Sequence, residues 1–286
     1  MKTKTILDFI GNTPLVEVET NIFAKLEGFN PGGSIKDRIV LNMILEAEKK
    51  RILKKGDTIV EPTSGNTGVA LAMVGAMKGY NVSLLMPETT SPEKIKMIKA
   101  FGGEVILIES IRFRKDVIAD IKERIEQGEK IVFLNQYENS MNPQAHYQKT
   151  AQEILRQLKG RKIDFFVAGM GTGGTITGIG RKLKQKHKDL KIIGVQPKAG
   201  ETIEGLRSLK EGFVPPILDL DLIDEIYDLE SIKAEEARDD LAKNKGILAG
   251  PSSGAALYIS REIAKNNPKA RIVTVFPDRG ERYLYY

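Results

Sequence analysis

A lysine on the apolar side of a predicted helix is well placed for covalent chemistry. Lys36 follows Ser34, a suitable N-cap, and apolar residues recur three, four, seven and eight positions after it: Ile39, Val40, Met43 and Ile44. This spacing puts Lys36 on the buried face. Burial lowers the pKa of a lysine, and an accessible neutral amine can form an imine with an aldehyde. A lysine that extends its ammonium to solvent at a helix end explains the position equally well.

A glycine-rich turn between a predicted strand and a predicted helix is suited to phosphate. In Gly171-Thr-Gly-Gly-Thr175, glycines let backbone N–H groups approach an anion, and the helix N-terminus favours its charge. Gly169-x-Gly171-x-x-Gly174 also fits the dinucleotide fingerprint, but the next strand ends in Gln196, where an acidic residue should hold the ribose. A nicotinamide-dependent oxidoreductase is therefore disfavoured. A tight turn without a ligand stays as the alternative.

Four polar side chains in one strand-to-helix turn indicate a carboxylate site. Thr63, Ser64, Asn66 and Thr67 surround Gly65 before an apolar helix, so hydroxyl donors and the helix dipole favour the same anion. One capping residue would serve a plain turn, and four favour a ligand. A second turn, Gly250-Pro-Ser-Ser-Gly254, indicates only a cap by itself.

The elements that position these turns alternate along the chain, as in parallel sheets covered by helices on both faces. We expect two open, twisted α/β lobes of mainly parallel strands with the active site in the cleft between them. One lobe should comprise residues 36–142, with a mobile part around 80–125, and the other residues 1–35 and 143–286. Strands are expected at 22–26, 58–60, 82–86, 104–108, 131–134, 165–168, 192–196, 225–227 and 271–276. Helices are expected at 34–50, 67–78, 91–101, 112–126, 143–158, 175–186, 233–243 and 253–265.

Composition bounds the possible functions. The 286 residues are 41% apolar and 29% charged with a net charge of +6, which excludes collagen and disorder. Without cysteine, disulfides and thiol chemistry are impossible, and two distant histidines give no metal site. The basic cluster at 181–188 falls late in a helix, where cations face water, so no nucleic-acid partner is expected. The N-terminus lacks a signal-peptide pattern and Val69–Met77 is too short to span a bilayer, so we expect a cytoplasmic protein without a membrane partner.

Several segments in one order give the chain a specific resemblance. They extend over almost the whole sequence: Gly11-Asn-Thr-Pro-Leu15, Lys25-Leu-Glu27, Asn30-Pro-Gly-Gly-Ser-Ile-Lys-Asp-Arg38, Thr63-Ser-Gly-Asn-Thr-Gly68, Gln136-Tyr with Asn142-Pro143, Gly171-Thr-Gly-Gly-Thr175 and Ser252-Ser-Gly254. The chain resembles the fold-type II pyridoxal-phosphate enzymes, and most closely the cysteine synthase (O-acetylserine sulfhydrylase) family.

The resemblance implies pyridoxal 5'-phosphate as cofactor and a role for each matching residue. Lys36 resembles the lysine that binds the cofactor aldehyde and later removes the substrate Cα proton. The implied cofactor contacts are Asn66 at the 3-hydroxyl, Ser252 at the pyridine nitrogen, and Gly171, Thr172, Gly173, Gly174 and Thr175 around the phosphate. The implied ligands of the substrate α-carboxylate are Thr63, Ser64, Gly65, Thr67 and Gln136.

The implied reaction is a β-replacement that makes L-cysteine from an O-activated L-serine and sulfide. A cystathionine β-synthase-like condensation of serine with homocysteine, or cysteine degradation with release of hydrogen sulfide, stays open. The family implies a homodimer, and docking of a serine acetyltransferase is left undecided.

One stretch departs from many cysteine synthases. Glu204-Gly-Leu-Arg-Ser-Leu-Lys-Glu-Gly-Phe213 is more similar to the B-type subfamily, which accepts bulkier or anionic substrates such as O-phosphoserine. Arg207 stands where the phosphoserine-using relatives carry an arginine, which implies a phosphate contact; a solvated loop charge is the alternative. The end at Tyr286 is earlier than the family leads us to expect and leaves open a missing tail.

Overall fold

The computed structural model describes residues 3–109 and 116–284, and these fall into two α/β units. One unit takes the chain up to Ile10 together with Lys36–Asn139, and the other takes Gly11–Ile35 and the chain from Ser140 onward. This division differs from the expected lobes, which assign the first ten residues to the second unit and end the first unit at residue 142. A four-residue 3-10 helix, Ile6–Phe9, is too short for its periodicity to assign it to either unit.

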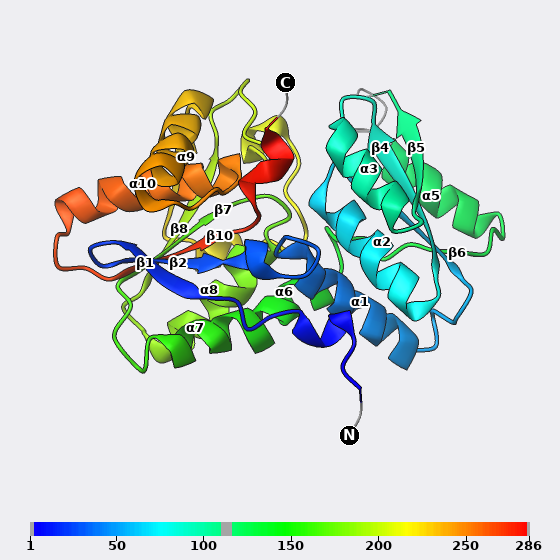
Figure 1. The fold of residues 1–286 in the computed structure, drawn as a ribbon, viewed down its shortest axis with the longest axis horizontal. Coiled ribbons are helices and arrows are strands. Elements are labelled where there is room, and N and C mark those ends of the chain that lie inside the picture. Colours follow the sequence, from blue (N-terminus) through cyan, green and yellow to red (C-terminus); the bar gives the residue numbers. More distant parts are fainter. Residues whose placement is uncertain (1–2, 110–115, 285–286) are drawn as a thin grey trace. The chain divides into compact units, whose positions relative to one another are not determined.

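The second unit contains a six-stranded sheet in the order β1-β2-β10-β7-β8-β9 (Figure 1). β1 runs antiparallel to β2, and the other neighbours are parallel. The strands are β1 (Leu15–Glu19), β2 (Ile22–Leu26), β7 (Phe165–Gly169), β8 (Lys191–Pro197), β9 (Glu225–Leu229) and β10 (Ile272–Phe276). The helices are α6 (Met141–Ala145), the π-helical turn His146–Thr150, α7 (Ala151–Gln157), α8 (Gly174–Lys186), α9 (Ser231–Lys245) and α10 (Pro251–Asn266).

Helices cover both faces of this sheet, as the sequence predicts (Figure 1). Successive residues of a strand face opposite sides, so Phe166 and Ala168 of β7 pack with α7 and α8, whereas Val167 packs with α9 and α10. In β10, Val273 faces the side of the sheet covered by α7 and α8, and Ile272 faces the side covered by α9 and α10. Strands buried on both faces need apolar residues throughout, which explains their continuous apolar sequence.

The first unit contains a four-stranded parallel sheet in the order β5-β4-β3-β6. Its strands are β3 (Thr58–Pro62), β4 (Asn81–Pro87), β5 (Glu104–Ile108) and β6 (Ile131–Val132). Its helices are α1 (Lys36–Lys49), α2 (Asn66–Lys78), α3 (Pro92–Ala100) and α5 (Val117–Glu126). α2 is buried from Thr67 to Gly75 and contacts α1, α3 and β4. Its apolar residues therefore surround the helix axis instead of forming one stripe.

Some expected elements are corrected. β1 was not predicted, because its register comes from pairing with β2 across a two-residue turn in which Asn21 has a φ of 61°. Ser34 is not the N-cap, because α1 begins at Lys36. Ser34 instead forms an isolated antiparallel β-bridge with Asp278. The helix expected at 143–158 is interrupted by the π-helical turn. Residues 112–115 of the helix expected at 112–126 lie outside the described residues.

Between β8 and β9 the chain is irregular, as expected, with only the short 3-10 turns Leu209–Glu211 and Leu220–Leu222 among its described residues. Further 3-10 turns are Glu27–Phe29 and Gly280–Tyr283. In the part of the chain that the structure describes, no helix is both long enough and apolar enough to cross a membrane.

Candidate active site

The turn Gly171–Thr175 lies at the carboxyl end of β7 and leads into α8. A Cβ on Gly171 would stand 2.6 Å from the carbonyl oxygen of Gly205, and Gly173 has a left-handed φ of 85°, so both positions require glycine. The first N–H groups of α8 lack intrahelical acceptors and mark the positive end of the helix dipole. This arrangement suits a phosphate dianion.

Two threonine hydroxyls of this turn are oriented by α6 and the π-helical turn that follows it. Asn142 Nδ2 donates to Thr172 Oγ1 at 3.2 Å, and Asn142 is buried. The ring of buried His146 lies between two hydroxyls, with Nδ1 3.0 Å from Thr150 Oγ1 and Nε2 3.4 Å from Thr175 Oγ1. Sequence reasoning assigned no role to His146, although it follows Asn142 by four residues, the spacing of neighbours on one helix face.

Ser252 and Arg207 reach the same region of the second unit. Ser252 is buried in the first turn of α10, and a Cβ on Gly205 would lie 3.5 Å from its Oγ. The Arg207 backbone N–H donates to Met170 O at 2.8 Å, directly before Gly171. The Arg207 guanidinium lies 5.6 Å from the centre of the Phe213 ring. The irregular stretch after β8 therefore lies along the glycine turn.

The polar turn of the first unit lies at the carboxyl end of β3 and opens α2. Thr67 Oγ1 donates to Gln136 Oε1 at 2.7 Å, and Gln136 Nε2 donates to Pro62 O at 3.4 Å. Thr63 Oγ1 accepts the N–H of Gly65 at 3.2 Å. Of the remaining predicted ligands, Asn66 is half-buried at the first position of α2 and Ser64 is exposed. The structure thus brings Gln136 to this turn across 69 residues.

A carboxylate that sequence reasoning missed lies beneath this turn. Glu61 of β3 is fully buried and accepts the N–H groups of Gln136 at 2.9 Å and Asn135 at 3.0 Å. Burial raises the pKa of Glu61 to about 7, against the opposite effect of these N–H groups. The signal in the sequence is a single charged residue within the apolar run Thr-Ile-Val-Glu-Pro.

Lys36 is the half-buried first residue of α1, and the apolar residues that were predicted to share its helix face are buried. Directly before it, the Ile35 N–H donates to Pro277 O at 2.8 Å, just beyond the end of β10. Buried Arg282 donates to Gly32 O at 3.0 Å. The segment that leads to Lys36 is therefore fixed at the carboxyl edge of the six-stranded sheet.

The motif residues Lys25 and Glu27 are structural. Buried Lys25 pairs with Glu153 at 2.7 Å and donates to Thr13 O at 2.6 Å. Glu27 accepts the Thr13 hydroxyl at 2.6 Å and the Asn30 amide at 2.9 Å. Satisfied buried polar networks of this kind rigidify the loops that contain them.

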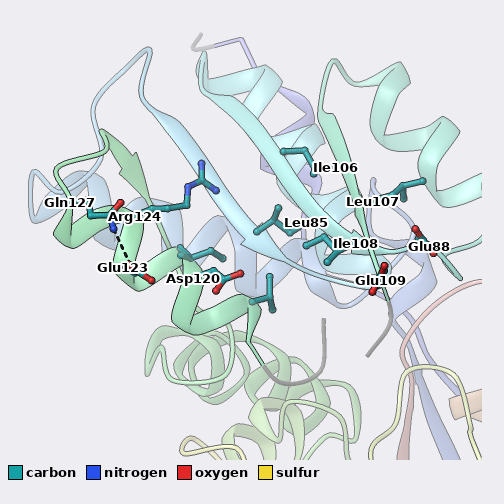
Figure 2. A pocket seen from close by; sticks show the side chains of 12 residues that line it. Leu85, Glu88, Ile106, Leu107, Ile108, Glu109, Asp120, Glu123, Arg124 and Gln127 are labelled. Carbon is teal, nitrogen blue, oxygen red and sulfur yellow. Dashed lines mark hydrogen bonds between the residues drawn. The ribbon is translucent and has the colours of Figure 1, made fainter. Parts of the chain in front are cut away.

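A pocket of about 700 Å³ lies elsewhere in the first unit and contains none of the predicted site residues (Figure 2). It is lined by Leu85, Glu88, Ile106, Leu107, Ile108, Glu109, Val117, Asp120, Ile121, Glu123, Arg124 and Gln127. At the end of α5, Gln127 donates to Glu123 at 2.9 Å (Figure 2). Arg124 donates to Glu129, just beyond the helix, at 2.6 Å. These polar groups satisfy one another, and the pocket does not coincide with the turns described above.

Comparison with known protein sequences covers nearly the whole chain. Residues 6–278 match the family model of the pyridoxal-phosphate dependent enzymes. The chain is 46% identical over 297 residues to a cysteine synthase of Aquifex aeolicus, across 98% of this chain and 90% of that protein. It is 43% identical over 290 residues to cysteine synthase B of Salmonella typhimurium, across 98% of this chain and 94% of that protein.

The similarity to solved structures also extends over nearly the whole chain. The crystal structure of an O-ureido-L-serine synthase matches with a TM-score of 0.92 and 37% identity, over 99% of this chain and 94% of that one. A hydrogen sulfide-producing enzyme of Fusobacterium nucleatum matches with a TM-score of 0.92 and 39% identity, over 99% of this chain and 100% of that one.

Proposed function

Because the chain belongs to the pyridoxal-phosphate dependent enzymes, and within them to the cysteine synthases, we propose that it makes L-cysteine from an O-activated L-serine and sulfide. The observation that carries the proposal is the presence of two turns in one chain: a glycine turn at the start of α8 and a polar turn suited to a carboxylate at the start of α2. The first suits a phosphate-bearing cofactor and the second an amino acid.

The residues of the chain fit pyridoxal phosphate. The Gly205 carbonyl leaves no room for a side chain at Gly171, and the N-terminus of α8 with the hydroxyls of Thr172 and Thr175 would hold the phosphate. Ser252 would hydrogen-bond the pyridine nitrogen, Asn66 the 3-hydroxyl, and Lys36 would bind the aldehyde carbon. When bound, the cofactor supplies an aldehyde that joins to an amine and a ring that withdraws electrons from the substrate Cα.

The side chains of the protein then bind the substrate and move its proton. Thr63, Thr67 and Gln136 would hold the substrate α-carboxylate at the N-terminus of α2, together with Ser64 and the N–H of Gly65. The contact of Gln136 Nε2 with Pro62 O is long, at 3.4 Å, so exchanging it for a bond to a carboxylate costs little. The amine of Lys36, once released from the cofactor, would take the proton from the substrate Cα.

Product analysis tests the proposal against its alternatives. The purified holoenzyme is supplied with O-acetylserine or O-phosphoserine and sulfide, with serine and homocysteine, or with cysteine alone. Cysteine formation in the first reaction supports the proposal. Cystathionine formation or release of sulfide at a higher kcat/KM would replace it with one of the other two reactions. We further propose that the enzyme is a cytoplasmic homodimer; light scattering of the purified protein tests the dimer.

Gln136→Ala should weaken amino-acid binding about tenfold, the typical cost of one hydrogen bond to a charged group. The resting absorption spectrum of the bound cofactor should not change, because Gln136 contacts Thr67 and Pro62 and is proposed to bind the substrate. Titration of the holoenzyme with L-serine measures both. Loss of the resting spectrum would assign Gln136 to the cofactor instead.

Arg207→Ala should lower kcat/KM for O-phosphoserine by roughly tenfold to a hundredfold, since a guanidinium can bind phosphate through two charge-assisted hydrogen bonds. O-Acetylserine should be spared. The support is the Arg207 backbone, which is anchored to Met170 next to the phosphate turn. Lys210→Ala, in the same stretch but paired with Asp228, is the control. Equal losses for both substrates would indicate that Arg207 only folds the loop.

A further inference from the structure

Glu61 joins two segments of the first unit where their backbone pairing stops. β3 and β6 pair through Thr58 with Ile131 and through Ile59 with Val132. Beyond this short ladder, the two carboxylate oxygens of Glu61 replace the backbone acceptors of a paired strand. Oε2 accepts the Asn135 N–H and Oε1 accepts the Gln136 N–H. A side chain of β3 thus fixes the backbone of a loop 75 residues away.

Only a carboxylate offers an acceptor to each of these two consecutive N–H groups. Asn135 has a left-handed φ of 49°, so the chain turns sharply at this point. The Asn135 carbonyl then accepts the N–H groups of Glu138 at 3.1 Å and Asn139 at 2.9 Å. A glutamine at position 61 would present one oxygen and one amide nitrogen, and that nitrogen can only donate. One backbone N–H would then lose its buried partner.

Glu61 lies in surroundings that oppose the charge of its ionised form. Leu84 of β4 is the register neighbour of Glu61, and the facing segment at 133–136 carries no charged residue. Burial is the largest cause of the raised pKa of Glu61, and the causes acting against it are the backbone N–H groups of Gln136, Asn135 and Leu134. Since apolar residues often stabilise a buried site as well as ionic ones do, stability alone does not account for a charge here.

The loop that Glu61 fixes presents the side chain of Gln136 to the start of α2. Gln136 is held at its backbone by Glu61 and at its side chain by the Thr67 hydroxyl, 2.7 Å from Oε1. Movement of the backbone at 135–136 would therefore carry the amide away from Thr67.

We propose that Glu61 is a positioning residue for the amino-acid substrate: its carboxylate holds the backbone of Asn135 and Gln136, and so keeps the Gln136 amide beside Thr67 to bind the substrate α-carboxylate. The inference rests on the proposed function in one respect, that Gln136 binds this carboxylate.

The test compares Glu61→Gln with the unmodified holoenzyme in a titration with L-serine followed by the absorption of the bound cofactor. The dissociation constant should rise about tenfold, because one N–H of the loop is left unpaired. Cofactor content and the resting spectrum should be unchanged. Glu48→Gln in α1, where Glu48 accepts the Tyr80 hydroxyl, is the matched control and should bind L-serine normally.

Two further readouts separate positioning from a purely structural role. In the double variant with Gln136→Ala, L-serine should bind as weakly as in Gln136→Ala alone, because Glu61 acts through Gln136. In the unmodified holoenzyme, L-serine binding should weaken as the pH falls from about 8 to about 6, because protonation removes one of the two acceptors of Glu61. Over the same pH range the affinity of Glu61→Gln should fall less than that of the unmodified holoenzyme.

The outcomes distinguish this inference from the proposed function. Normal affinity in Glu61→Gln beside weakened affinity in Gln136→Ala would overturn the role of Glu61 and leave the proposed function intact. Normal affinity in Gln136→Ala would overturn both the inference and the assignment of Gln136 to the substrate carboxylate, whereas product analysis decides the reaction. Multiplied losses in the double variant would show that Glu61 acts independently of Gln136 and would overturn the inference. If Glu61→Gln fails to fold, Glu61→Asp replaces it in each of these comparisons, because an aspartate is too short to reach both N–H groups.

Discussion

Replacing Lys36 with alanine should lower turnover at least roughly a thousandfold, because the proposed function uses this one side chain both as the covalent anchor of the cofactor and as the base at the substrate Cα. The fold should be unaffected, since Lys36 is only half-buried at the first position of α1. Cofactor should still bind through the phosphate turn Gly171–Thr175. Steady-state kinetics and cofactor content of the purified variant measure these effects.

Chemical labelling identifies the lysine independently of activity. Borohydride reduction of the unmodified holoenzyme followed by peptide mapping should place the pyridoxyl group on Lys36. Lys49→Ala, an exposed position at the end of the same helix, should retain full activity. A label on any other lysine would contradict the assignment, whatever the activity of Lys36→Ala.

Gly174→Ala should weaken cofactor binding about a hundredfold. An added Cβ would stand 1.9 Å from Asn142 Oδ1 and 2.5 Å from Asn142 Cγ, so Asn142 would have to leave Thr172, whose hydroxyl it orients. Overpacking of this kind costs about 3 kcal/mol at the upper end of its usual range, which corresponds to a hundredfold change in an equilibrium constant. Titration of the apoenzyme with pyridoxal phosphate measures the affinity.

Gly180→Ala in the same helix is the matched control. Its Cβ would contact the flexible end of Leu222 at 3.0 Å, and alanine is the better helix former. Its cofactor affinity should equal that of the unmodified protein. Equal affinities for Gly174→Ala and the unmodified protein would show that the turn before α8 does not hold the phosphate.

The local elements were largely predictable from the sequence because local physics specifies them. Continuous apolar runs at β7, β8 and β10 predicted strands buried on both faces, and their bounds differ from the structure by one or two residues. Glycines and small polar residues marked the turns before α2 and α8. β1 was missed because an edge strand takes its register from its neighbour, and the π-helical turn was missed because it leaves the apolar periodicity of the helix nearly unchanged.

Contacts between distant segments could not be predicted in this way. The Gly205 carbonyl that makes glycine necessary at position 171 comes from an irregular loop, and His146 reaches Thr175 across 29 residues. Sequence reasoning assigned no role to Glu61, and the structure places the N–H groups of Asn135 and Gln136 against its carboxylate. None of these pairs leaves a periodic pattern in the sequence.

The sequence by itself determined which residue types are available for chemistry and which elements carry them: an amine at a helix start, a glycine turn suited to phosphate and a polar turn suited to a carboxylate. Only the tertiary structure decided which groups orient these residues, such as Asn142 at Thr172 and Glu61 at the loop of Gln136. The physical reason is that helix periodicity, capping and glycine conformation act within a few residues. Buried hydrogen bonds instead depend on where the packing within each unit brings distant backbone groups together.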